Sequence, residues 1–373
     1  MRKFENDCLK FLLKIVSVKS LSKDEIKVSK IIAQEMRTLG YDSVKTDKFG
    51  NVVGFIGSGK KKILYDAHTD TVGIADRTQW KTDPYKAVFK NGNVYGRGAS
   101  DDKGCVAAMV YAGALIKEQR LLGDFTLCVS ASAREEIGET QWLDFILKDL
   151  KFRPDCVVIG EPSDLKIIRG HKGRAEFKLT VRGKSVHASI PHKGINAVHR
   201  AADFIKRIEL LNKKYKAAKL GKPVISVTQV ETQNASINTI PDNCSFYIDR
   251  RNVDGESEKQ IVDEIKRACG PHTGIIYKKF YSAWILGKEH RLTKTASAAY
   301  KKIFRANPKI CLWPFCTNGS FTMGDRNIPS IGFGPGEEKL AHVANEYIRF
   351  ADVAEAVKFY SIFPLTFCSQ KIK

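Results

Sequence analysis

Short apolar segments alternate with helix-like segments over the first 160 residues of the chain. The strand-like segments are residues 51–56, 62–67, 125–133 and 156–160, and the helix-like segments are residues 4–18, 24–38 and 104–118. Such alternation predicts a mostly parallel sheet that is covered by helices on both faces. We also expect Ser22 and Glu25 to form a capping box that opens the second helix.

The pattern changes after Gly173, where the order becomes strand, helix, strand, strand, helix, strand. This is the split βαβ order of a small ferredoxin-like domain. We therefore expect an α/β fold in which a ferredoxin-like α+β lid, residues 174–282, is inserted into a hydrolase-like catalytic domain. That catalytic domain would comprise residues 1–173 and 283–373. A length of 373 residues is also more than one ordinary domain needs.

Acidic residues and histidines follow several of the apolar segments. In an open α/β sheet, ligands bind at the carboxyl ends of the strands. Taken singly, each such residue is explained as well by a helix cap or a loop contact. Together, imidazole and carboxylate groups are the ligand types of a dinuclear metal site. The segments that carry them are DAHTDTV (His68, Asp70), GRGASDDKG (Asp101, Asp102), SASAREEIGE (Glu135, Glu136), VVIGEPSD (Glu161) and AHVANE (His342).

The spacing of these residues indicates different tasks. Asp70 lies two residues after the histidine of DAHTDTV, so it could orient that ring by a hydrogen bond. Asp101 and Asp102 stand in a glycine-flanked turn, where a carboxylate could bridge two cations. Glu135 and Glu136 are expected in an extended segment, in which neighbouring side chains point to opposite sides. One of them could then bind metal while the other acts as a general base.

Several motifs resemble the metallohydrolase superfamily of acetylornithine deacetylase, succinyl-diaminopimelate desuccinylase, aminoacylase and carboxypeptidase G. YDAHTDTVG, GRGASDDKG, RGHKGR, TNGSFTMG and IGFGPGEE further resemble the YgeY-type group, which is linked by name to selenium metabolism. The resemblance implies that Glu135 is the general base and that Asp70 orients a ligand histidine. The family pattern Asp-x-Lys-Gly selects Asp101 over Asp102 as the bridging ligand. The implied metal ligands are His68, Asp101, Glu136, Glu161 and His342.

The resemblance also implies roles for residues of the lid. In relatives, a lid histidine reaches the site of the partner subunit and helps to hold the oxyanion, and GKSVHAS places His187 there. Asn238 of NTIP and Arg251 match positions that contact substrate, and the neighbouring Arg250 stays open as an alternative. We therefore expect a homodimer that forms through the lid.

The expected activity is hydrolysis of an amide bond in a small acylated amino acid or a short peptide. Two divalent metal ions would activate the attacking water. Zinc is the default, and the oxygen-rich ligand set leaves cobalt and manganese open. Two alternatives remain: a dinuclear aminopeptidase of a related fold without this lid, and a basic polyanion-binding protein without catalysis.

Charge and cysteine content limit the partners and the compartment. The net charge is +21, but the lysines are spread in short patches, so we do not expect nucleic acid as a partner. Nine cysteines without a CxxC pair indicate a reduced, cytoplasmic protein. We expect no signal peptide and no membrane association, because no apolar run approaches the roughly 18 residues that a membrane span needs.

Overall fold

The computed structural model describes residues 2–121, 123–234, 236–271 and 273–369, which form two compact units. Unit 1 comprises Met1–Gly170, Leu286–Trp313 and Thr317–Lys373. Unit 2 comprises His171–Ile285 and Pro314–Cys316. Most of unit 2 is therefore one continuous insertion into the chain of unit 1.

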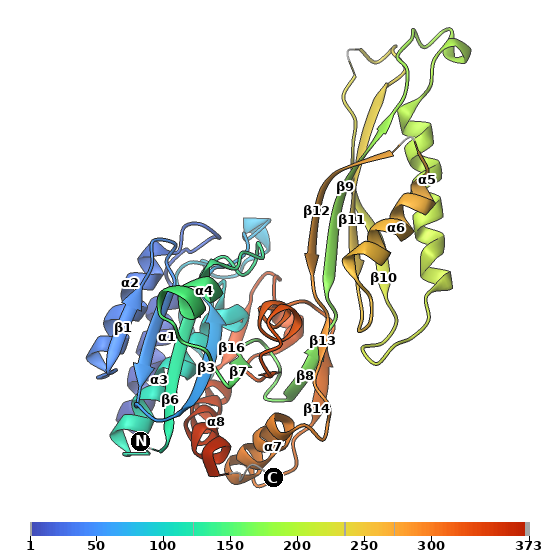
Figure 1. The fold of residues 1–373 in the computed structure, drawn as a ribbon. Helices are drawn as coiled ribbons and strands as arrows, with labels where there is room; N and C mark the ends of the chain where they lie inside the picture. The colour runs from blue at the N-terminus through green and yellow to red at the C-terminus, as the bar shows by residue number, and fades with distance from the viewer. Residues whose placement is uncertain (1, 122, 235, 272, 370–373) are drawn as a thin grey trace. The chain divides into compact units, whose positions relative to one another are not determined.

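Unit 1 is built on a mixed sheet with a parallel centre (Figure 1). Its strands are β1 (Ser43–Thr46), β2 (Val52–Ile56), β3 (Lys61–His68), β6 (Phe125–Ser132), β7 (Cys156–Ile159), β8 (Ile167–His171), β14 (Ile310–Trp313) and β15 (Ser330–Gly332). The order is β1-β2-β6-β3-β7-β15-β8, and β14 pairs with β8. Neighbours among β6, β3, β7 and β15 run parallel, whereas β1, β2 and β8 pair antiparallel. This confirms the predicted α/β fold.

Helices surround this sheet. They are α1 (Arg2–Val16), α2 (Ile26–Thr38), α3 (Gly104–Glu118), α4 (Gln141–Asp144), α7 (Arg291–Phe304) and α8 (Phe350–Ser369). The small residues of α3 allow close packing, because a Cβ on Gly113 would lie 2.2 Å from the Tyr41 hydroxyl. That hydroxyl donates to the carbonyl oxygen of Val110 over 2.8 Å. Within the described residues, no helix has both the length and the apolar character that crossing a membrane requires.

Smaller elements complete unit 1. A three-stranded sheet has the order β16-β5-β4. Its strands are β4 (Val88–Lys90), β5 (Asn93–Tyr95) and β16 (Tyr347–Arg349). Short 3₁₀ or π turns are η1 (Arg77–Gln79), η2 (Ala99–Lys103), η3 (Phe145–Asp149), η5 (Ser320–Asp325) and η6 (Glu338–Leu340).

The predicted capping box at the start of α2 is wrong. The helix begins one residue after Glu25, which makes no side-chain cap hydrogen bond. The Ser22 hydroxyl instead donates to Asp70 Oδ2 over 2.6 Å. Glu25 Oε1 accepts from the backbone amide of Arg134 over 3.1 Å. Both side chains are therefore used to hold the loops that follow β3 and β6.

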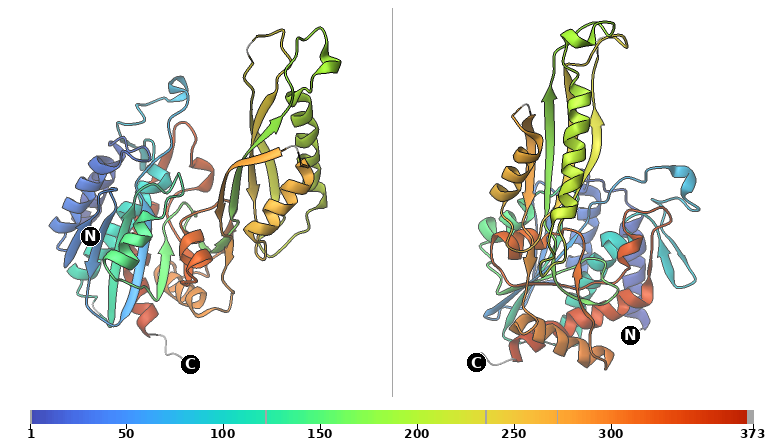
Figure 2. Two further views of the ribbon diagram at one scale, coloured as in Figure 1. Left: turned by 45° about the horizontal axis from the view of Figure 1, so that its top comes forward. Right: turned by 90° about the vertical axis from the view of Figure 1, so that its right-hand side faces the viewer.

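Unit 2 has the predicted ferredoxin-like arrangement. Its elements are β9 (Arg174–Arg182), η4 (Pro191–Lys193), α5 (Ala197–Lys214), β10 (Val224–Glu231), β11 (Asn243–Arg251), α6 (Glu258–Cys269), β12 (Thr273–Tyr281) and the short β13 (Trp284–Ile285). The four-stranded sheet has the order β10-β11-β9-β12, and all of its neighbours are antiparallel. Figures 1 and 2 show α5 and α6 on one face of this sheet.

Alternating burial along the strands explains this packing. In β9 every second residue is buried, and Phe177 and Leu179 join Phe246 of β11 in one apolar cluster. Phe204 of α5 and Ile265 of α6 cover that cluster. Each such side chain contributes about 1.5–3 kcal/mol when it is fully buried. Unit 2 therefore has a hydrophobic core of its own.

Candidate metal centre

Five acidic or histidine side chains meet in unit 1 near the ends of parallel strands. His68 is the last residue of β3, Glu136 follows β6, and Glu161 follows β7. Asp101 comes from the turn that precedes α3, and His342 comes from the loop before β16. Because β6, β3 and β7 are parallel neighbours, their carboxyl ends bring the first three residues together.

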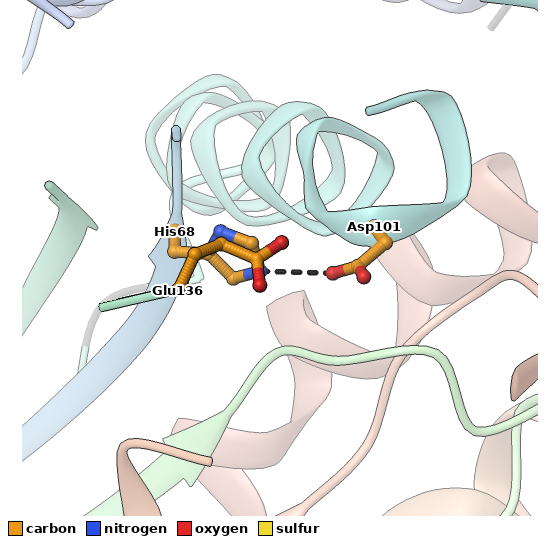
Figure 3. A group of neighbouring side chains, drawn as sticks. All are labelled: His68, Asp101 and Glu136. Atoms are coloured by element: carbon orange, nitrogen blue, oxygen red, sulfur yellow. Dashed lines mark hydrogen bonds and ion pairs between the residues drawn. The ribbon is translucent and has the colours of Figure 1, made fainter. Parts of the chain in front are cut away.

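Asp101 lies between the two histidines. Its Oδ1 atom is 2.9 Å from His68 Nε2, and its Oδ2 atom is 3.1 Å from His342 Nε2. Glu136 Oε1 lies 3.0 Å from the ring nitrogen of His342, and Glu161 Oε1 lies 3.9 Å from His68 Nε2. Figure 3 shows the Asp101 carboxylate directed at the His68 ring, with Glu136 beside it. The side chains thus form two groups, His68 with Glu161 and His342 with Glu136, and both groups contact the Asp101 carboxylate.

This donor set fits two divalent cations. Ligand atoms of His68, Asp101 and Glu136 all lie within 4.8 Å of one another, and the same holds for His68, Glu135 and Glu161. Among the described residues, no lysine or arginine forms an ion pair with these four carboxylates. Buried carboxylates without a cation are costly. Imidazole and carboxylate ligands suit zinc and related ions.

Asp102 belongs to neither of these two groups of possible ligands. It is fully buried, and its Oδ2 atom accepts from the backbone amide of His68 over 3.1 Å. A cis peptide bond joins it to Asp101. Asp102 therefore holds the end of β3, whereas its neighbour supplies the oxygen atoms of the cluster.

Asp70 orients more than one residue. The His68 ring places Nδ1 2.9 Å from the Asp70 carbonyl oxygen and 3.5 Å from its Oδ1 atom. The same carboxylate accepts from the backbone amides of Glu135 over 3.0 Å and Glu136 over 3.2 Å. Contact with the histidine was expected from the sequence, whereas contact with the two glutamates was missed. Asp70 thus fixes both the ring and the glutamate pair.

The two glutamates lie in a turn and not in the extended segment that the sequence predicts. The turn covers residues 135–138, and the Gly138 amide donates to the Glu135 carbonyl oxygen over 2.7 Å. The strand ends earlier, at Ser132, and the amides of Glu135 and Glu136 donate to the Asp70 carboxylate and not to a neighbouring strand. The alternation argument used for the pair is therefore wrong, although both carboxylates still join the cluster.

Burial governs the electrostatics of the cluster. Burial, together with the nearby carboxylates of Glu136 and Asp70, raises the pKa of Glu135 to about 8 against the opposing effect of His68. Burial also raises the pKa of Glu161. Hydrogen bonds to Asp101 and then to Glu136 raise the pKa of His342 to about 10. The cluster therefore favours positive charge beside its carboxylates.

Unit 2 carries the other predicted site residues. Asn238 Nδ2 lies 3.3 Å from His187 Nε2, and both side chains are exposed. Arg251 is partly exposed and donates to Asp249 Oδ1 over 2.7 Å. Arg250 is fully buried and pairs with Glu256 over 2.6 Å. The two arginines therefore occupy different environments, although they are neighbours on one strand.

One buried acidic residue escaped the sequence reasoning. Glu346 is fully buried, and its carboxylate accepts from the Arg97 side chain and from backbone amides of the turn that carries Asp101. Its position four residues after His342 was the only available signal.

Fold and site together define a class of hydrolase that combines a parallel-centred α/β unit, a histidine and carboxylate cluster at its strand ends, and a ferredoxin-like insertion. Residues 64–365 match the model of peptidase family M20/M25/M40, and the chain belongs to this family. It is accordingly a metal-dependent hydrolase that acts on amide bonds.

Similar proteins agree with this assignment. The uncharacterized protein YgeY of Escherichia coli (strain K12) is 33% identical over 97% of this chain and 95% of its own length. An acetylornithine deacetylase of Buchnera aphidicola subsp. Acyrthosiphon pisum (strain 5A) is 28% identical over 83% of this chain and 81% of its own. The M20 family metallo-carboxypeptidase Sso-CP2 of Sulfolobus solfataricus has a similar fold, with a TM-score of 0.84 at 20% identity, covering 98% of this chain and all of that one. The resemblance inferred from the motifs is thereby confirmed.

Proposed function

We propose that the chain hydrolyses the amide bond of an N-acyl amino acid or a short peptide with two bound divalent ions. His68 and Glu161 would hold one ion, Glu136 and His342 the other, and Asp101 would bridge them. The observation that carries this proposal is the placement of Asp101, whose two oxygen atoms each face a different histidine over 2.9 and 3.1 Å. A carboxylate that has a potential ligand nitrogen on each of its two sides suits a two-metal site.

Glu135 is the proposed general base. It lies in the same cluster as His68 and Glu161, and its carboxylate is not needed as one of the five proposed ligands, so it is available to accept and release a proton. When bound, the two ions would supply Lewis acidity that makes water acidic and stabilises negative charge on the substrate oxygen. Glu135 would take the proton of the attacking water and deliver it to the leaving nitrogen. Asp70 would hold the turn that positions it.

The proposed substrate contacts lie in unit 2. His187 would hold the developing oxyanion and Asn238 would contact the substrate, which is supported by their exposed, adjacent side chains. Arg251 is partly exposed, so its guanidinium could bind a substrate carboxylate. We assign Arg250 a structural role, because it is buried and paired. A homodimer through unit 2, with His187 acting on the partner's site, and a cytoplasmic location complete the proposal.

Metal removal and reconstitution test this function. Protein treated with a chelator should lose all activity against a panel of N-acetyl amino acids and dipeptides. Zinc, cobalt or manganese should restore it, and the most effective ion would identify the preferred metal. The panel would separate a deacylase from a dipeptidase. Full turnover by protein that contains no metal would refute the proposal, as would a wild-type protein that binds no divalent ion.

A further inference from the structure

We propose that Glu346 is a positioning residue that fixes Asp101 relative to His342. This inference rests on the proposed function, because it assigns Glu346 to the geometry of the two-ion site. Glu346 does not reach the cluster itself. It would act by holding the two backbone segments from which the bridging carboxylate and one ligand histidine project.

The first segment is the turn before α3. Glu346 Oε1 accepts from the backbone amides of Ser100 over 2.8 Å and Asp101 over 3.0 Å. Its Oε2 atom accepts from the amide of Gly98 over 3.0 Å and from the Arg97 guanidinium over 2.8 Å. Three of the four donors are therefore backbone amides of one turn, and one of these amides belongs to the proposed bridging ligand.

The shape of this turn explains why it needs a buried acceptor. Gly98 has a φ of +83°, and Asp101 has non-helical dihedral angles, φ −126° and ψ 89°. Amides in such a backbone cannot all find partners in a helix or a sheet, and buried amides without partners are rare. One carboxylate group with two oxygen atoms can accept several of these donors at once. Glu346 thus replaces regular secondary structure at this place.

The second segment carries Glu346 itself. His342 precedes it by four residues, and the following residue, Tyr347, begins β16 and pairs with Tyr95 of β5. The backbone of Glu346 accepts from the amide of Gly96 over 3.0 Å. Its backbone and its side chain therefore join the loop of His342 to residues 96–101. Since His342 Nε2 lies only 3.1 Å from Asp101 Oδ2, a shift of either segment would open the ion site on this side.

A purely structural ion pair is the competing explanation. Arg97 contacts one oxygen atom of Glu346 and also stacks on Trp80, with 5.1 Å between the guanidinium carbon and the ring centroid. The Arg97–Glu346 ion pair accounts for only one of the four donors to the Glu346 carboxylate described above. It leaves unexplained why both oxygen atoms accept amides from the turn that presents Asp101. The two explanations differ in whether a change at Glu346 alters metal affinity or stability alone.

Zinc titration of chelator-treated protein tests the proposal without any substrate. The E346Q side chain keeps the size of Glu346 but places an NH₂ donor where an oxygen atom accepts. Wild-type protein should bind two zinc ions in isothermal titration calorimetry. E346Q should bind one of them about 10–100-fold more weakly, as is typical when the partners of metal ligands are changed. The matched control is E355Q, which removes a charge on α8 that pairs with Lys358 across 2.6 Å. It should bind both ions as the wild type does.

Thermal unfolding in chelator separates the two explanations. If E346Q only unfolds at a lower temperature while its folded form binds both ions with wild-type affinity, the proposal is overturned. If E346Q does not fold, E346D decides instead, because it keeps the charge but shortens the reach. Weaker binding of one ion by E346D supports the proposal, and unchanged binding overturns it. A wild-type protein that binds no zinc would overturn the proposed function as well, which distinguishes the two failures.

Discussion

Two carboxylates of the site receive opposite tasks from their surroundings. Burial alone would raise the pKa of Asp70, but hydrogen bonds from His68, from Ser22 and from the Glu135 amide lower it below its ordinary value. Glu135 is half-buried among other carboxylates, and its desolvation together with their charges raises its pKa to about 8. Asp70 therefore stays an ionised acceptor at neutral pH, whereas Glu135 can carry a proton.

Replacing Glu135 by glutamine tests the role of the base. Glu135→Gln should reduce kcat by about 10²–10⁴-fold, the usual contribution of a general base. It should still bind two metal ions, because the proposed ligands are other residues. Steady-state kinetics and metal analysis of the same sample check both parts. Undiminished kcat would exclude Glu135 as the base, and loss of an ion would make it a ligand.

Metal binding should release protons. In the metal-free protein the pKa values of Glu135, about 8, and His342, about 10, lie above 7, so both groups hold a proton at neutral pH. A cation needs a neutral imidazole nitrogen and favours ionised carboxylates, so these protons must leave. Zinc affinity should therefore increase between pH 6 and pH 8. Calorimetry at pH 7 in two buffers with different ionisation enthalpies measures the protons, and equal heats in both would contradict the prediction.

At the scale of elements, β11 separates two neighbouring arginines. Successive side chains of a strand point to opposite faces. Arg250 consequently enters the core of unit 2, where it pairs with Glu256 and lies over the Tyr215 ring, with its guanidinium carbon 4.3 Å from the ring centroid. Arg251 lies on the other face, partly exposed beside Asp249. The dipeptide alone does not tell which arginine is buried, but the preceding apolar residues Cys244, Phe246 and Ile248 alternate in phase with Arg250 and mark its face as the covered one.

Substitution of each arginine by methionine should separate stability from substrate binding. Arg250→Met should lower the free energy of unfolding by about 3 kcal/mol, at the low end for breaking a buried pair, because Glu256 is 24% exposed. Arg251→Met should change it by about 1 kcal/mol or less but raise KM. Urea unfolding and steady-state kinetics check both variants. A large loss of stability in Arg251→Met with unchanged KM would reverse the assignment.

Regular elements could be predicted from the sequence better than the contacts of the loops. Residues 104–118 were expected to form a helix, and α3 has these bounds, because its mostly small apolar residues include no proline and tolerate one internal glycine. The partners of Ser22 and Glu25 could not be predicted. A capping box uses neighbours three residues apart, whereas Ser22 binds Asp70, 48 residues away in the chain. Glu346 escaped for the same reason, since its amide partners lie about 250 residues earlier.

At the scale of the whole molecule, every proposed metal ligand and the proposed base lie in unit 1, whereas His187, Asn238 and Arg251 lie in unit 2. The proposed homodimer makes this division testable. If His187 acts on the partner's site, neither His187→Ala nor Glu135→Gln alone should be active. A mixture of the two should recover roughly a quarter of the wild-type activity, since half of the dimers would be mixed and each would have one complete site.

Reversible dissociation and re-pairing of the subunits is needed for this measurement, and sedimentation analysis should show a dimer. A monomer in solution would refute the homodimer. Absence of recovery in a mixture that demonstrably contains mixed dimers would mean that His187 acts within its own chain or plays no part in turnover.

The insertion of unit 2 as nearly one continuous segment has an evolutionary consequence. If Asn238 and Arg251 contact the substrate as proposed, mutations between residues 171 and 285 that spare His187 can change which molecules are recognised, while the proposed metal ligands and Glu135, encoded elsewhere in the gene, stay intact. New specificities can therefore arise by variation in one contiguous stretch of coding sequence. Directed evolution of this enzyme toward other amides should accordingly concentrate its mutations there and leave the strand ends of unit 1 untouched.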